Sequence, residues 1–229
     1  FAQVIDRYVI RPESKQIALA LLLGQKESLG KEVKQAYSAT GTQHILAVSG
    51  LHVGIIYSIL LLPLTYFKQE GHALRKSYLL LVMGLIWVYA LMTGFSPSVV
   101  RAVVMFSLVT LGQMRKRKPS IWNILSFSAL LLLVLDPGVR TDLGFQLSYL
   151  AVAGIVGLQP LILQLWSPPN RVLDYFWQMA AVTLAAQLIT SPLTIHYFHT
   201  FPSYFLLANL LIVPLSYLIL CAGVPFLLL

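Results

Sequence analysis

The chain of 229 residues is 58% hydrophobic and only 10% charged, with a mean hydropathy of +0.78 and a formal net charge of +8. A soluble domain carries roughly a quarter charged residues, so this composition excludes an ordinary soluble protein and indicates that lipid surrounds most of the chain. The positive charge fits the Lys and Arg that membrane proteins collect in cytoplasmic loops better than it indicates a nucleic-acid-binding surface.

Residues 1–40 differ from the rest of the chain, because they mix charged residues with apolar ones at helical spacing, such as Val33 and Tyr37. We expect two or three amphipathic helices here, lying at the membrane surface. A transmembrane domain is predicted over residues 41–229. We also expect further spans beyond this chain, because it stops inside an apolar run.

Continuous apolar runs make up the rest of the sequence. They lack the alternation of polar and apolar residues that is typical of a transmembrane β-barrel. At about 20–25 residues per crossing plus loops, the length allows roughly six to eight spans. The sequence therefore predicts an all-α, polytopic transmembrane bundle of about seven helices, over residues 42–67, 77–92, 97–114, 120–135, 143–166, 172–197 and 204–229.

Loop charges predict how these spans are oriented. The loops after the second, fourth and sixth runs carry only Arg140. Basic loops face the cytoplasm, so the N-terminal segment is predicted outside, although Lys26, Lys31 and Lys34 near the first run oppose this orientation. The loops after the first, third and fifth runs carry the remaining basic residues: Lys68, Arg75, Lys76, Arg115, Lys116, Arg117, Lys118 and Arg171.

The first apolar run carries two histidines, His44 and His52, which would share one face of a helix because they are eight residues apart. Ser49 lies between them, and Gly50 and Gly54 permit close helix approach. Helix packing, a Ser–His nucleophile pair and a His–His metal pair are all compatible with this pattern. Because no acidic orienter and no convincing third ligand accompany the histidines, we favour helix packing and predict no metal or other cofactor.

The third span is predicted to have a polar start. Ser96 is a favourable N-cap and Pro97 a favourable first helical residue, so we expect the helix to begin there. Ser98 and Arg101 follow, and a guanidinium beside unpaired backbone N–H groups favours an anion. Because Arg is costly in hydrocarbon, Arg101 must face a polar interior, face a partner, or extend to the lipid headgroups.

Polar residues also open the fifth span. Asp142 is typical of an N-cap, and Gln146 and Ser148 then enter the span beside Phe145 and Tyr149. Hydrogen bonds between helices would explain them, at about 0.6–2 kcal/mol per contact. The span therefore presents polar groups without requiring a chemical role for them.

The last two spans combine polar residues with prolines. Pro192 and Pro214 predict broken helices, which membranes tolerate where the freed backbone lines a cavity or meets other protein groups. Each signal is weak alone, but together they describe helices with a polar interior. The polar residues of these spans are Gln187, Thr190, Ser191, His196, His199 and Asn209.

Four stretches of the sequence follow one another in an order that is found in a known family: HILAVSGLHVG at 44–54, SPSVVRAVVM at 96–105, GFQLSYLAV at 144–152 and ANLLIVPL at 208–215. Through them the chain resembles the membrane competence domain of the ComEC family of DNA-uptake proteins. The resemblance runs from about Ile17 to the C-terminus, and the first stretch is highly specific. Tyr149 stands where many relatives have Phe.

The resemblance implies a channel that carries one DNA strand across the inner membrane of a bacterial cell during natural transformation. It also implies OB-like and metallo-β-lactamase-like domains elsewhere in the full-length protein, a DNA receptor outside and a DNA-translocating ATPase inside. This sequence has no His-x-His-x-Asp-His cluster, so we expect no nuclease or other enzymatic activity in it. It also has no Gly-rich ATP-binding loop, so a partner would supply the driving force.

Single-stranded DNA is held through its phosphates by spaced basic groups and through its bases by aromatic faces, here Arg101 with Phe95, Phe145 and Tyr149. Weak contacts suit transit, because a tightly held strand would not leave. We assign structural roles to Gly50, Gly54, Pro97, Pro192 and Pro214. The residues predicted to line the path are His44, Ser49, His52, Ser96, Ser98, Arg101, Phe145, Gln146, Ser148, Tyr149 and Asn209.

Three other functions are compatible with the same residues. A secondary transporter for a small organic anion would also aim broken helices at a buried Arg, but its site would be closed on at least one side. An intramembrane hydrolase would use Ser49 and His52. A structural scaffold would tolerate the loss of both Arg101 and His52.

Overall fold

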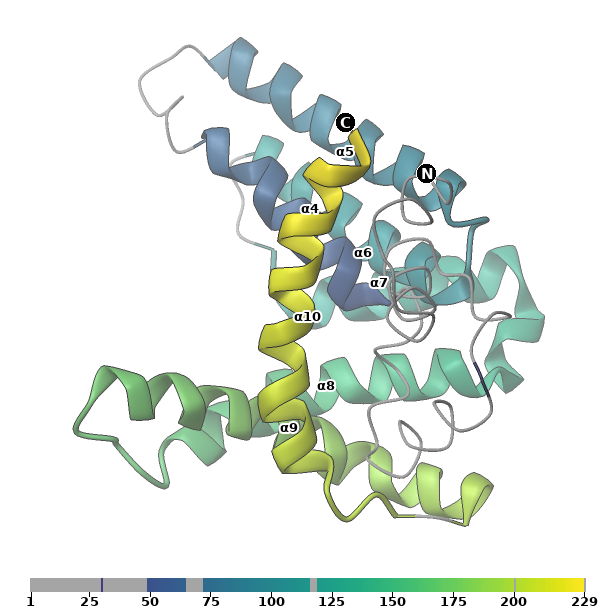
Figure 1. Ribbon diagram of the computed structural model, residues 1–229. Coiled ribbons are helices and arrows are strands. Elements are labelled where there is room, and N and C mark those ends of the chain that lie inside the picture. The colour runs from purple at the N-terminus through teal and green to yellow at the C-terminus, as the bar shows by residue number, and fades with distance from the viewer. Residues whose placement is uncertain (1–29, 31–48, 65–71, 116–118, 200, 229) are drawn as a thin grey trace. The chain divides into compact units, whose positions relative to one another are not determined.

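The computed structural model describes residues 30, 49–64, 72–115, 119–199 and 201–228. These residues form α-helices and no strand, which confirms the all-α prediction (Figure 1). A short 3-10 helix, η2 (Pro137–Thr141), joins two of them. The α-helices are α4 (Gly50–Leu61), α5 (His72–Met92), α6 (Pro97–Met114), α7 (Ile121–Leu135), α8 (Leu143–Leu163), α9 (Arg171–Phe198) and α10 (Phe205–Leu228).

The helices have the length and composition of membrane spans. Four of those described are long and apolar enough to cross a bilayer, at Leu74–Met92, Pro97–Met114, Leu143–Leu163 and Arg171–Phe198. Shorter apolar helical stretches are Gly50–Leu64, Ile121–Leu135 and Phe205–Ile219, the last of which is part of α10. Most predicted boundaries hold to within a few residues, and α6 has the predicted bounds at both ends. The protein is therefore a polytopic helical membrane protein.

The first predicted span is the exception, because α4 begins at Gly50 and not near residue 42. Ser49 has an extended backbone (φ −122°, ψ 173°), so a continuous helix over 42–67 is wrong. The idea that His44 and His52 share one helix face fails with it. His44, the predicted surface helices of residues 1–40, and the loop residues Lys68, Lys116, Arg117 and Lys118 lie outside the described residues.

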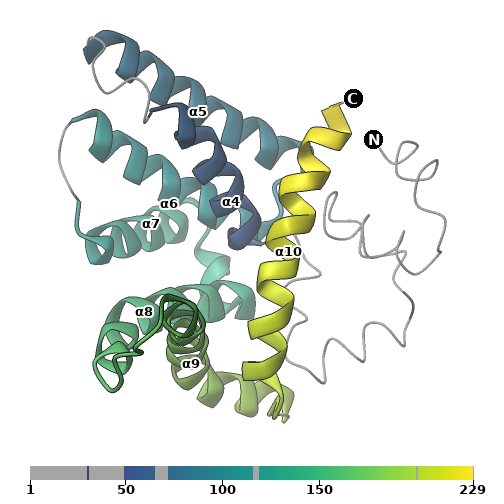
Figure 2. The same cartoon turned by 60° about the vertical axis from the view of Figure 1, so that its left-hand side comes forward.

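Two compact units make up the fold, and one of them spans residues 48–146. In this unit α4, α5 and α6 pack against one another around buried aliphatic side chains, and α7 packs on α6 (Figure 2). Their core contains Val53, Val82, Ile86, Val99 and Val103.

Helices α4 and α6 run parallel, as three successive contacts show. A Cβ atom built on Gly50 would lie 3.5 Å from the Cβ of Ala102, and one on Gly54 would lie 3.4 Å from an aromatic ring of α6. One turn later the hydroxyls of Tyr57 and Thr110 are 3.0 Å apart. The small residues therefore allow close approach, as predicted, and the amino-terminal ends of α4 and α6 lie at the same end of the unit.

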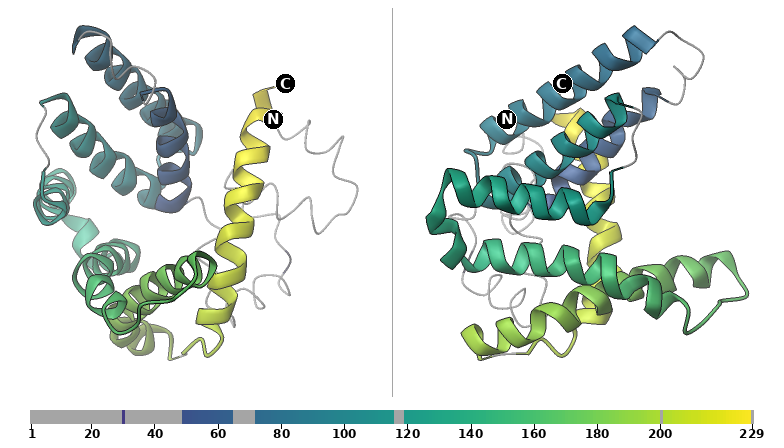
Figure 3. Two further views of the ribbon diagram at one scale, coloured as in Figure 1. Left: turned by 90° about the vertical axis from the view of Figure 1, so that its left-hand side faces the viewer. Right: turned by 180° about the vertical axis from the view of Figure 1, so that it is seen from behind.

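The other unit includes residues 147–229. Helix α10 packs on α9 (Figure 3), and α8 approaches α9 closely at one glycine. At Gly154 the two helices approach so closely that an added Cβ would lie 2.7 Å from the carbonyl oxygen of Ala185 and 2.9 Å from the side chain of Ile189. Only glycine fits there without a shift of the α9 backbone.

Neither Pro192 nor Pro214 interrupts its helix. Pro192 lies inside continuous α9, and Pro214 inside continuous α10. Around Pro192 the hydroxyls of Thr190, Ser191 and Thr194 donate to backbone carbonyls one turn earlier. None of these bonds reaches the carbonyl of Leu188, which Pro192 leaves without its usual N–H partner, yet the helix continues, so the break predicted from the sequence is wrong.

The close approach at Gly154 can be tested by substitution. Gly154→Ala should lower the free energy of unfolding by about 1–3 kcal/mol, because the new methyl group must displace the backbone of α9. Gly84→Ala in α5 is the matched control, since nothing lies within 4 Å of its Cβ position, and it should leave stability unchanged or raise it by up to about 1 kcal/mol. Titration of the purified protein with a denaturing detergent measures both. Equal stability of the two variants would contradict the contact.

Candidate functional site

At the start of α4, Ser49 and His52 form a capping box. The backbone N–H of Ser49 donates to Nδ1 of His52 (3.2 Å), and the Ser49 hydroxyl lies 3.1 Å from the same nitrogen. His52 is fully buried. A histidine thus occupies the position that Glu or Gln usually fills in this motif. Because Nδ1 accepts a hydrogen bond, the proton of the neutral ring is on Nε2.

This geometry bears on the Ser–His nucleophile pair considered from the sequence. The Ser49 hydroxyl is within hydrogen-bond reach of Nδ1, the atom that would have to take its proton. That atom already accepts the backbone N–H of Ser49 itself. The pair is therefore explained by the start of α4, and the favoured interpretation of helix packing needs no chemistry from it.

The turn between α5 and α6 has an unusual backbone. Gly94 and Phe95 both have positive φ, at 66° and 51°. For a residue other than glycine this costs roughly 1–2 kcal/mol, and the N–H of Phe95 recovers a bond to the carbonyl of Ala90 (2.8 Å). The Phe95 ring is left about half exposed (47%). The turn therefore presents an aromatic face directly before α6.

Helix α6 begins where the sequence predicts, with Ser96 as N-cap and Pro97 as first residue. The Ser96 hydroxyl does not cap the helix. Instead its oxygen is buried without a hydrogen-bond partner in the described part of the chain. Ser98 follows, half-buried. The start of α6 thus holds a buried hydroxyl oxygen that has no hydrogen-bond partner among the described residues.

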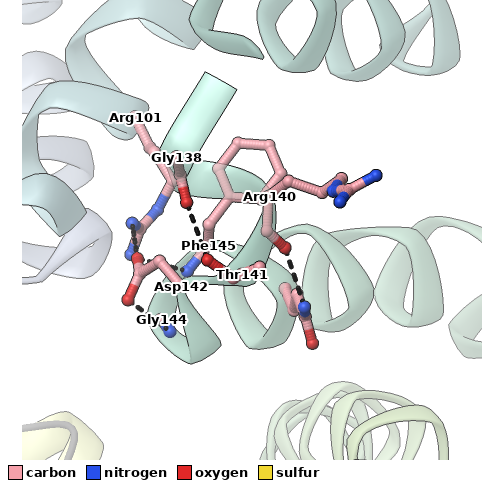
Figure 4. Close-up of polar contacts among 8 residues, drawn as sticks. Arg101, Gly138, Arg140, Thr141, Asp142, Gly144 and Phe145 are labelled. Atoms are coloured by element: carbon pink, nitrogen blue, oxygen red, sulfur yellow. Dashed lines mark hydrogen bonds and ion pairs between the residues drawn. The ribbon is translucent and has the colours of Figure 1, made fainter. Parts of the chain in front are cut away.

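Arg101 lies in the second turn of α6 and is buried, with only 9% of its side chain exposed. It does not extend to the surface, which was one of the three alternatives. Its Nη1 atom is 3.5 Å from Oδ2 of Asp142, whose side chain is 45% exposed (Figure 4). The guanidinium therefore faces a carboxylate of the protein itself.

Asp142 also caps α8, as predicted. Its Oδ2 atom accepts the N–H of Phe145 (2.9 Å), and Oδ1 accepts the N–H of Gly144 (3.2 Å). A Cβ on Gly144 would lie 3.3 Å from Asp142 Oδ2 and 3.6 Å from Arg101 Nη2, so glycine keeps this space open. One carboxylate thus starts α8 and neutralises Arg101, and the amino-terminal ends of α6 and α8 meet.

The pairing of Arg101 with Asp142 was missed from the sequence, where each residue was explained by its own helix. The sequence did contain a signal for this pair. Successive spans cross the membrane in opposite directions, so the starts of the third and fifth spans must lie on the same side. Opposite charges at those two starts are candidates for an ion pair.

The other predicted path residues divide between the two units. Phe145 is buried at the start of α8, and the Gln146 amide donates to the carbonyl of Arg140 (2.8 Å), so it stabilises the connection to α8 (Figure 4). Ser148 and Tyr149 are half-buried further along α8. Asn209 is buried in α10, with its Oδ1 atom unpartnered among the described residues. That these residues line one path stays a prediction.

Within the described residues, no group of three or more His, Cys, Asp or Glu side chains is arranged to hold a metal ion. The chemistry available at the amino-terminal ends of α4, α6 and α8 is therefore that of hydrogen bonds, one buried cation and one partly exposed carboxylate.

Comparison with known proteins places the chain among its relatives. A family model described as "Competence protein" matches residues 21–229. ComE operon protein 3 of Bacillus subtilis (strain 168) is 32% identical over 206 residues, covering 90% of this chain and 25% of the relative. An uncharacterized protein of Aquifex aeolicus (strain VF5) is 32% identical over 180 residues, covering 77% of this chain and 40% of the relative. Recombination protein 2 of Haemophilus influenzae is 27% identical over 208 residues, covering 87% of this chain and 26% of the relative. The chain therefore spans 25–40% of the length of these relatives. No solved structure matches it.

The two roles of Asp142 can be separated by substitution. Asp142→Asn keeps an oxygen that caps α8 but removes the charge facing Arg101, and should cost about 1–2 kcal/mol because the exposed partner is partly screened. Asp142→Ala should cost about 1 kcal/mol more through loss of the cap. Denaturing-detergent titration measures both. The control is Asp136→Asn, an exposed carboxylate that also accepts a backbone N–H, and a cost as large as that of Asp142→Asn would argue against the ion pair.

The role of His52 can be tested in the same way. If the ring acts through its acceptor atom, His52→Gln should preserve the capping box and keep the amount of folded protein in the membrane within about twofold of wild type. His52→Ala should reduce it more strongly, because the Ser49 N–H loses its acceptor and the core gains a cavity. Quantitative immunoblotting of membranes reports the result. Equal loss in both variants would mean that the imidazole itself is required.

Proposed function

The chain belongs to the Competence protein family, and on this premise we propose that it forms part of the path by which one strand of DNA crosses the cytoplasmic membrane of a bacterium during natural transformation. The names of the relatives agree with a role in competence and recombination. The observation in this chain that carries the proposal is the buried cation of Arg101 at the amino-terminal end of α6.

The chemistry at this end of residues 48–146 suits a single strand. Proteins that hold single strands combine basic groups for phosphates with aromatic faces for bases. Arg101 supplies one cation, and Phe95 offers an exposed ring only six residues before it. A single cation, paired with one carboxylate, also suits transit better than a dense basic patch would, since conduction requires that each contact be released.

The orientation proposed from loop charges puts this end outside. Among the described residues, Arg75, Lys76, Arg115 and Arg171 lie at one set of helix ends, and Arg140 lies at the other set. By the positive-inside rule the first set faces the cytoplasm. Arg101 and Asp142 would then lie at the outer mouth, where an incoming strand first meets the protein.

Several partners complete the proposal. OB-like and metallo-β-lactamase-like domains would belong to the same full-length protein. A DNA receptor outside would deliver the strand to the outer mouth. A DNA-translocating ATPase inside would pull the strand through, because we propose no energy-converting role for this chain itself.

The proposal is tested in the full-length parent protein at normal expression. Replacement of Arg101 by Ala should lower internalisation of labelled DNA at least tenfold, because the only proposed phosphate contact of the outer mouth is lost. Arg140→Ala is the matched control, since it removes an exposed arginine from the same side of the membrane, and it should stay within about twofold of wild type. Membrane abundance is measured in parallel. Normal uptake by the Arg101 variant at normal abundance would remove Arg101 from the path.

A further inference from the structure

The two side chains of the Arg101–Asp142 pair differ in their exposure to solvent. The guanidinium side chain is 9% exposed, whereas the carboxylate side chain is 45% exposed. Their closest approach of 3.5 Å is longer than the roughly 2.7–2.9 Å that is typical of a strong charge-assisted hydrogen bond. The contact is therefore a loose one between a buried cation and an anion that solvent can reach.

Loss of the contact between them would also affect the two charged groups differently. Asp142 accepts backbone N–H groups of Gly144 and Phe145, so its carboxylate stays bonded if the guanidinium is taken by another anion. A buried guanidinium needs a negative charge beside it, because an uncompensated charge in a low-dielectric surrounding costs several kcal/mol. Arg101 thus requires an anion, but nothing in this geometry requires that the anion be Asp142.

Resting on the proposed function, we propose that Asp142 is an exchangeable stand-in for a DNA phosphate at Arg101. Because Oδ2 of Asp142 both faces Arg101 and accepts the Phe145 N–H, the guanidinium is the group that moves: it turns from Oδ2 to a backbone phosphate that arrives at the exposed side of Asp142, while Asp142 stays on its N–H donors as the cap of α8. When the strand advances, Asp142 pairs with Arg101 again. The ligand class is a phosphodiester, recognised without regard to base.

Charge balance makes such an exchange favourable for transit. A phosphodiester and a carboxylate each carry one negative charge, so the buried guanidinium is compensated before, during and after the exchange. The binding free energy of a phosphate is then only the difference between two ion pairs, and each contact stays weak enough to release. The strand would pass Arg101 one phosphate at a time, because no single phosphate is bound there in a deep free-energy minimum.

The experiment measures binding of a fluorescent oligothymidine to the full-length protein in lipid nanodiscs. Asp142→Asn, which keeps the cap but removes the competing charge, should tighten the Kd about five- to tenfold and at the same time slow DNA uptake. Asp136→Asn removes a charge from the same connection and should change the Kd less than twofold. Arg101→Met should weaken binding and lower the slope of log Kd against log salt by about 0.7, the value for one phosphate contact on a single strand.

A double-mutant cycle distinguishes exchange from a general electrostatic effect. In the Arg101→Met background, Asp142→Asn should change the Kd less than twofold. An equal effect in both backgrounds, or an unchanged Kd in Asp142→Asn alone, would overturn the exchange. If Asp142→Asn does not fold, Asp142→Ser, another neutral N-cap residue, takes its place with the same expectations.

Different experimental results would contradict the proposed function and the proposed exchange. If the wild-type protein neither binds the oligothymidine nor supports uptake, the proposed function is wrong, and the exchange falls with it. If wild type does both, and Asp142→Asn binds no tighter, then only the exchange is wrong. A peptide nucleic acid of the same sequence, which has no phosphates, should bind equally to wild type and Asp142→Asn, and tighter binding to the variant would contradict phosphate as the ligand.

Discussion

A guanidinium buried among apolar helices must have an anion beside it, and the polar end of residues 48–146 is organised around this requirement. Moving an ion out of water costs several kcal/mol even after the protein relaxes, and Arg101 is almost fully removed from solvent. The connection through η2 returns the chain so that Asp142 meets Arg101. Since Asp142 also caps α8, one carboxylate fixes where α8 begins and neutralises the cation of α6.

The helices that start at this end satisfy their first backbone N–H groups, which have no partner within the helix, in different ways. Helix α4 uses the reciprocal contacts of Ser49 and His52, and α8 uses the Asp142 carboxylate. Helix α6 begins with Pro97, which has no N–H to satisfy, after a turn with left-handed backbone. These local solutions gather hydroxyl, imidazole, carboxylate and guanidinium groups at one end of an otherwise apolar unit, and they give that end its capacity to meet a charged ligand.

The sequence predicted features that are encoded locally. Long apolar runs located the spans, and Ser96, Pro97 and Asp142 marked helix starts correctly. Asp142 does so because its side chain caps α8 within one turn, and Pro97 because it suits a first helical residue, whereas the Ser96 hydroxyl makes no cap. The start of α4 was missed because Ser49 lies inside a run that hydropathy alone treats as continuous. The Arg101–Asp142 pair joins residues 41 positions apart, so no local pattern contains it. The breaks predicted at Pro192 and Pro214 were wrong because membrane helices tolerate proline, and both α9 and α10 continue through theirs.

The hydroxyl groups of α9 have a consequence for the hydrogen-bonding character of that helix. Thr183, Thr190, Ser191 and Thr194 all direct their protons to carbonyl oxygens one turn earlier. Each oxygen then retains lone pairs but has no proton to offer. Through these four hydroxyl groups α9 offers hydrogen-bond acceptors, so a molecule beside them would bind through its own N–H or O–H groups, as the Gln187 amide does where it donates to the Ser191 hydroxyl.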